Sequence, residues 1–145
     1  MKKLLVLIAV LAAAIIAPGS AQAQTGVNGI CTFQGQYNVP KPIWSATYLG
    51  GSWDVGGATV YCPQRHNSDV YEYFQYKFTA WTTLSFDAWL GQDLDPVTSF
   101  AGWFDTNHGC QHGASYRIHW SVVNPTTGAV VDYANSSTVL GSNVC

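Results

Sequence analysis

The stretch "VYEYFQYKFTAWTTLSF", residues 70–86, alternates between two kinds of side chain and decides the fold class. Its even positions are apolar or aromatic except for Glu72 and Thr82, whereas its odd positions mix aromatic rings with Gln75, Lys77 and Thr79. A period of two residues is typical of a β-strand with one face toward the core and the other toward solvent. We therefore expect the even positions to face the core.

The run of seventeen residues is longer than a usual strand of about 3–10 residues. We expect a bend or bulge near Thr82 and Thr83 that divides it into two strands. A second alternating run, residues 116–140, contains the turn-forming sequence "NPTTG" at 124–128 and predicts a β-hairpin. We expect irregular structure over residues 91–109, because glycine, proline and acidic residues interrupt any periodicity there.

Short alternating runs separated by Gly, Pro, Asn and Asp, without an amphipathic helix, predict an all-β fold. The architecture that we expect is a two-sheet antiparallel β-sandwich, immunoglobulin-like, cross-linked by two disulfides. A small β-barrel is the alternative that the same pattern allows.

The first 23 residues predict a cleaved signal peptide. Lys2 and Lys3 precede the apolar run Leu4–Ala17, and small residues surround the expected cleavage site after Ala23. The apolar run has 14 residues, whereas a membrane-spanning helix needs about 20. We therefore expect a single secreted β domain, residues 24–145, that is monomeric, extracellular or periplasmic, and not inserted in a membrane.

Beyond residue 23 the chain carries eight acidic side chains and only four basic ones, a formal net charge of −4. Binding to nucleic acid or to anionic lipid requires clustered cations. The four cations are scattered along the sequence, at Lys41, Arg65, Lys77 and Arg117. The sequence therefore argues against nucleic acid and membrane surfaces as partners.

The four cysteines are an even number in a chain that we expect to be exported, which favours disulfides over metal ligation. Three pairings are possible. We favour Cys31 with Cys62 and Cys110 with Cys145, because each bond then closes a loop of similar length. A loop of about 30 residues stabilises the fold by on the order of 3–4 kcal/mol in the chain-entropy model.

The segment around Cys110 also offers metal ligands. His108, His112 and Asp105 could hold zinc or copper. Histidines four residues apart share one face of a helix, but Gly109 and Gly113 disfavour a helix here. The alternative is a glycine-rich, cross-linked loop with solvated histidines.

A catalytic role is weighed for Glu72, His119 and Arg117. A carboxyl group on the apolar side of its strand could act as a general acid if it were buried. We instead expect Glu72 to lie at the start of the strand, where burial has not begun. Arg117 and His119 alternate with apolar residues and are expected on the solvent side of the sheet. No recognised hydrolase pattern is present, so we assign no catalytic residue and no cofactor.

The odd positions of the long strand suggest a binding surface. Tyr71, Tyr73 and Trp81 are interleaved with Gln75, and aromatic rings beside amides suit the apolar faces and hydroxyls of a sugar. The opposing interpretation is a central strand buried on both faces. We expect a non-catalytic protein that binds an extracellular polysaccharide or cell-surface glycan.

Two other classes of function remain open. One is a protein-interaction module or an inhibitor of secreted enzymes, which would bind a secreted or surface protein through the rigid loop 93–113. The other is a metal-dependent or acid–base hydrolase that uses the loop containing His108 and His112.

Overall fold

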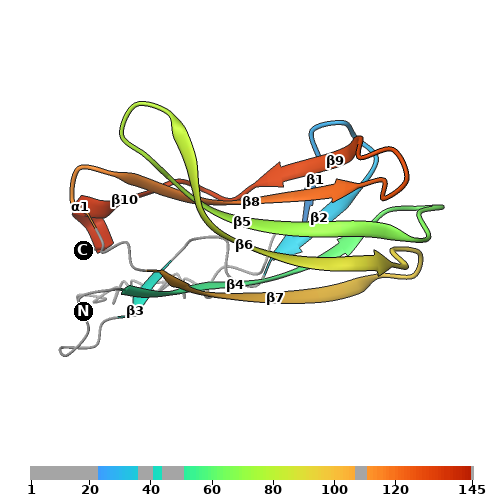
Figure 1. The fold of residues 1–145 in the computed structure, drawn as a ribbon, viewed down its shortest axis with the longest axis horizontal. Helices are drawn as coiled ribbons and strands as arrows, with labels where there is room; N and C mark the ends of the chain where they lie inside the picture. The colour runs from blue at the N-terminus through green and yellow to red at the C-terminus, as the bar shows by residue number, and fades with distance from the viewer. Residues whose placement is uncertain (1–22, 36–40, 44–50, 107–110, 145) are drawn as a thin grey trace, which may run out of the picture.

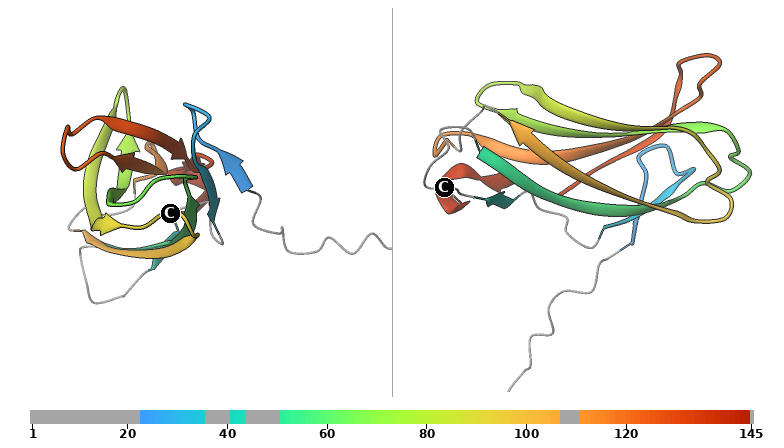
Figure 2. Two further views of the ribbon diagram at one scale, coloured as in Figure 1. Left: turned by 90° about the vertical axis from the view of Figure 1, so that its right-hand side faces the viewer. Right: turned by 60° about the horizontal axis from the view of Figure 1, so that its bottom comes forward.

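The computed structural model describes residues 23–35, 41–43, 51–106 and 111–144. Two five-stranded antiparallel sheets pack face to face (Figure 1; Figure 2), so the all-β sandwich expected from the sequence is confirmed. The first sheet contains β1 (Ala23–Thr25), β2 (Thr32–Gly35), β3 (Lys41–Ile43), β4 (Gly51–Tyr61) and β7 (Thr98–Thr106). The second contains β5 (Ser68–Lys77), β6 (Trp81–Gln92), β8 (Ser115–Val123), β9 (Val130–Asn135) and β10 (Val139–Leu140).

The only helix in the described ranges is α1 (Gly141–Val144). Within those ranges, no helix combines the length and the apolar character needed to cross a bilayer.

The alternation in β5 is confirmed. Val70, Glu72 and Phe74 are fully buried, whereas the side chains between them are half-buried on the opposite face of the sheet. β5 lies between β6 and β8, so it is a central strand covered by the other sheet on one face only. The alternative of a strand buried on both faces is therefore wrong for this strand.

The break in the long run comes earlier than expected. β5 ends at Lys77 and β6 begins at Trp81, so a hairpin turn divides the run into two strands. The bulge expected near Thr82 and Thr83 is present within β6, at the next residue. Leu84 is an extra residue in β6, because Phe74 pairs with Ser85 and Gln75 pairs with Thr83. One inserted residue moves the following side chains to the other face.

That inversion explains why the even-position pattern fails after Leu84. Phe86 occupies an even position but is 57% exposed, on the outer face beside Tyr73. Trp89 occupies an odd position and packs against the core. Its ring lies 5.1 Å from Phe100 of the first sheet and 5.9 Å from Trp120 of the second.

The segment expected to be irregular contains a strand. Residues 98–106 form β7, which pairs with β4 along its length. The glycine-containing segment 51–57 belongs to β4 and accommodates a register shift between Asp54 and Gly57. Glycine is disfavoured in strands, but pairing with neighbours on both sides keeps this backbone extended.

The hairpin over residues 116–140 is confirmed. β8 and β9 pair across the turn at 124–128, where Gly128 has a φ of +69° that favours glycine. The side-chain oxygen of Asn124 accepts hydrogen bonds from the backbone N–H groups of Thr126 and Thr127. β10 also pairs with β8, so this segment returns twice to the same strand.

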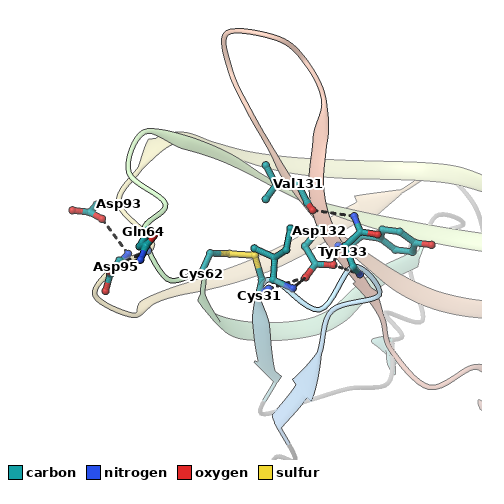
Figure 3. Close-up of a disulfide and its surroundings, with 10 residues drawn as sticks. Cys31, Cys62, Gln64, Asp93, Asp95, Val131, Asp132 and Tyr133 are labelled. Carbon is teal, nitrogen blue, oxygen red and sulfur yellow. Dashed lines mark hydrogen bonds between the residues drawn. A yellow bond between two sulfur atoms is a disulfide. The ribbon is translucent and has the colours of Figure 1, made fainter.

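The predicted disulfide between Cys31 and Cys62 is confirmed and lies in the core (Figure 3). It links the start of β2 to the end of β4, and it closes a loop with a sequence separation of 31. The second predicted bond, Cys110 with Cys145, lies outside the described residues. The expected signal peptide, residues 1–23, lies outside them as well, apart from Ala23.

A buried carboxylate joins the two sheets near this disulfide. Asp132 of β9 accepts hydrogen bonds from the backbone N–H groups of Asn28, Ile30 and Cys31, at 2.7–2.8 Å (Figure 3). Gly26 lies so close to this carboxylate that a β-carbon would overlap it. Burial alone would raise the pKa of Asp132, but backbone N–H donors, including that of Tyr133, hold it below the ordinary value.

We predict that Asp132→Asn destabilises the fold by roughly 2–4 kcal/mol, because an amide cannot accept all of the N–H groups that surround the charged carboxylate. Urea unfolding at pH 7 measures the change. The matched control is Asp93→Asn, at an exposed carboxylate that contacts His66 at 2.7 Å and accepts the backbone N–H of Asp95 at 3.1 Å. Exposed contacts of this type are worth about 1 kcal/mol or less. Equal losses in the two variants would contradict this role for Asp132.

Candidate functional site

The outer face of the second sheet carries a hollow of about 620 Å³. Three neighbouring strands build it, because the antiparallel register places Tyr73 of β5 beside Phe86 of β6 and His119 of β8. The hairpin between β8 and β9 closes one side. The residues that line the hollow are Tyr71, Tyr73, Gln75, Thr83, Phe86, His119, Ser121, Val123, Gly128 and Val130.

Three aromatic rings form the apolar part of the hollow. Tyr71 and Tyr73 stack with centroids 5.9 Å apart and ring planes 16° from parallel. The ring of Phe86 lies 5.9 Å from Tyr73 and 6.5 Å from Tyr71, and it is tilted to both. The two tyrosines are there because odd positions of β5 point outward. Phe86 is there because the bulge at Leu84 reverses the alternation of β6.

His119 supplies the central polar group. Its Nδ1 lies 2.9 Å from Oδ1 of Asn135. An amide oxygen only accepts, so Nδ1 donates and Nε2 remains available as an acceptor. Burial lowers the pKa of His119, and the positive charge of Arg117 lowers it further, against the opposing effect of the Asn135 hydrogen bond. The imidazole is therefore neutral at pH 7.

Gln75 connects the hollow to a basic group at its edge. Nε of Arg117 donates to Oε1 of Gln75 at 2.9 Å, and Nε2 of Gln75 donates to the hydroxyl of Thr83 at 3.3 Å. The guanidinium of Arg117 lies 4.1 Å from the ring centroid of Trp81, and the ammonium of Lys77 lies 5.1 Å from it. Trp81 therefore lies beside the hollow, where its ring makes cation–π contacts with both side chains.

The predicted binding residues fall into two groups. Tyr71, Tyr73 and Gln75 line the hollow together, whereas Trp81 lies on the same face next to it. Sequence reasoning did not single out Phe86 or Ser121. Phe86 could have been found only from the register of the hairpin, because its even position suggests the core.

Glu72 lies on the opposite side of the same sheet. It has an exposed fraction of 0%, and neither carboxyl oxygen has a hydrogen-bond partner among the described residues. Burial, and then the nearby charge of Asp87, raise its pKa to about 9. The expectation that burial has not begun at this position is wrong, because the first sheet covers this end of β5 as well. Glu72 and His119 are on opposite faces and cannot act on one substrate.

Of the three predicted metal ligands, the structure describes the side chain of one only. His112 is exposed, His108 lies outside the described residues, and Asp105 is described only as backbone in β7. No cluster of three potential ligands occurs within the described part of the chain.

Comparisons with known proteins identify no relative. No family model matches the chain, and no curated protein or solved structure matches it significantly.

The burial of Glu72 predicts an unusual dependence of stability on pH. A carboxyl group whose pKa rises from 4.5 to about 9 on folding gives its full stabilisation below pH 4.5 and loses it progressively up to pH 9. We predict that Glu72→Gln and the wild type have similar stability near pH 4.5. At pH 9 the variant is more stable by on the order of a few kcal/mol. Urea unfolding over this range measures the difference, and parallel curves would contradict the buried state of this carboxyl group.

Proposed function

We propose that this protein is a secreted, non-catalytic binding protein that recognises a polysaccharide or cell-surface glycan through the hollow on the outer face of its second sheet. The observation that carries the proposal is the stacked pair Tyr71 and Tyr73 in an open hollow that also contains Phe86, an amide, hydroxyls and a neutral imidazole.

The composition of the hollow suits a sugar. A pyranose ring has an apolar C–H face that packs on aromatic rings, and its hydroxyls need donors and acceptors at the rim. Gln75, Thr83 and Nε2 of His119 offer these groups next to the rings. The strands around them are fixed by the sheet, so little conformational entropy is lost when a ligand binds.

Export forms part of the proposal. The leader-like segment at residues 1–23 suggests it, and the disulfide between Cys31 and Cys62 supports it. Disulfides persist in oxidising compartments and are rare where thiols are kept reduced.

Recognition of a protein is the second candidate, because the same region exposes apolar side chains. Phe86, Leu90 and Val130 are all more than half exposed, and β6 is the edge strand of its sheet. Exposed apolar patches and free strand edges are common at protein interfaces. The loop first considered for an inhibitor, residues 93–113, contains the strand β7 and is a less suitable element for that purpose.

We predict that Tyr73→Ala weakens glycan binding about tenfold or more, equivalent to roughly 1.4 kcal/mol, because the ring contacts both Tyr71 and Phe86 in the hollow. Isothermal titration against neutral and acidic polysaccharides measures the effect. The matched control is Phe78→Ala, which removes an aromatic ring that is 55% exposed in the hairpin turn and does not line the hollow.

Two results would contradict the proposal. One is the absence of heat with every glycan; the other is an equal loss of affinity in the two variants. Capture of a secreted protein that Tyr73→Ala abolishes, without any glycan binding, would favour the second candidate.

A further inference from the structure

Two cations stand at the edge of the hollow, although the chain as a whole is acidic. Beyond residue 23 the sequence contains only four lysines and arginines. Two of them, Arg117 and Lys77, lie on the outer face of the second sheet around the ring of Trp81. The hydrogen bond from Arg117 to Gln75 joins this pair directly to the wall of the hollow.

Neither cation forms an ion pair with any side chain that the structure describes. The only ion pair among those side chains joins His66 to Asp93, and neither residue belongs to β5. On β5 the nearest acidic residue with the same outward parity is Asp69, whose carboxylate accepts the backbone N–H of Gly91. Eight residues of extended strand separate Asp69 from Lys77, about 26 Å, well beyond the screening length of about 8 Å at physiological salt.

The contacts of Arg117 leave some of its N–H donors available to bind a ligand. Its Nε donates a hydrogen bond to Gln75, and its guanidinium packs against the indole ring of Trp81. The two terminal nitrogens make no hydrogen bond to a described residue. Arg117 is half-buried, and this burial lowers its pKa because water solvates the charged form incompletely. A fixed, partly desolvated guanidinium is well suited to bind a planar anion.

We propose that the ligand of the hollow is an anionic polysaccharide, with a sugar ring stacked on Tyr71 and Tyr73 and a carboxylate or sulfate group bound by Arg117 and Lys77. This inference rests on the proposed function and specifies its ligand. Trp81 is then a positioning residue, because it orients the two cations rather than stacking on a sugar. The net negative charge of the chain does not oppose this contact, since charges beyond about 8 Å are screened at physiological salt.

The test compares polymers that differ in charge. Polygalacturonate and its methyl ester share one backbone, as do dextran sulfate and dextran, so each pair isolates the anionic group and the two pairs distinguish carboxylate from sulfate. Polyaspartate is a polyanion without sugar rings. We expect at least one charged glycan to bind more than tenfold tighter than its neutral partner and more tightly than polyaspartate. This preference should weaken as salt increases.

Three variants locate the anion site. Arg117→Gln should reduce the preference for the charged polymer about tenfold or more, because it removes a charge-assisted hydrogen bond. Lys77→Gln should reduce it about threefold, since an ammonium acts as a point charge and lacks the planar fork of donors of a guanidinium. Arg65→Gln removes the same charge from the loop at the opposite end of β5 and should change nothing. Unfolding curves of each variant identify any loss of fold. If Arg117→Gln does not fold, the expected threefold effect of Lys77→Gln still tests the anion site.

The outcomes separate this inference from the proposal on which it rests. Equal binding of charged and neutral polymers, sensitive to Tyr73→Ala, overturns the anionic ligand and leaves glycan recognition intact. Equal binding of polyaspartate and the charged glycans overturns the inference as well, because the rings then contribute nothing. Absence of binding to every polymer overturns both.

Discussion

The structure depends on the burial of only one face of β5. Its inward side chains complete the core between the sheets, whereas its outward ones receive no second layer. Because side chains alternate strictly along a strand, Tyr71 and Tyr73 cannot enter the core once Val70 and Phe74 do so. The same constraint places Glu72 inside, where its carboxyl group has no hydrogen-bond partner among the described residues. The aromatic hollow and the buried carboxyl group of Glu72 therefore both follow from which face of β5 is turned toward the core.

A small number of contacts join the sheet that contains β5 to the other sheet. The rings of Trp89, Trp120 and Phe100 fill the space between the layers. At one end, the disulfide between Cys31 and Cys62 fixes the first sheet, and the Asp132 carboxylate ties its β1–β2 turn to β9 of the second. The hollow thus lies on a face whose backing layer is cross-linked, which favours a preformed binding surface over one that orders on binding.

Sequence reasoning succeeded where a periodicity was uninterrupted and local. The alternation of residues 70–77, the hairpin around "NPTTG" and the bond between Cys31 and Cys62 all follow from spacing. The β7 strand was missed because glycine and acidic residues lower its intrinsic preference, and pairing with β4 overrides that preference.

The candidate site could be predicted only in part, for a different reason. Tyr71, Tyr73 and Gln75 share one strand, so their common face is visible in the sequence. Phe86 joins them only through the extra residue Leu84 in the neighbouring strand, and no local pattern reveals such an insertion. The cross-strand partnership of Gln75 with Arg117 likewise depends on register between segments that are 42 residues apart.

The most direct test of the binding surface is an NMR titration of the aromatic ring resonances with a soluble oligogalacturonate. We predict that the resonances of Tyr71, Tyr73 and Phe86 shift with a common affinity, whereas those of the core rings Phe74 and Tyr116, both fully buried, do not. Shifts confined to rings elsewhere, such as the exposed His112, would contradict the assignment of the outer face of the second sheet as the ligand-binding surface.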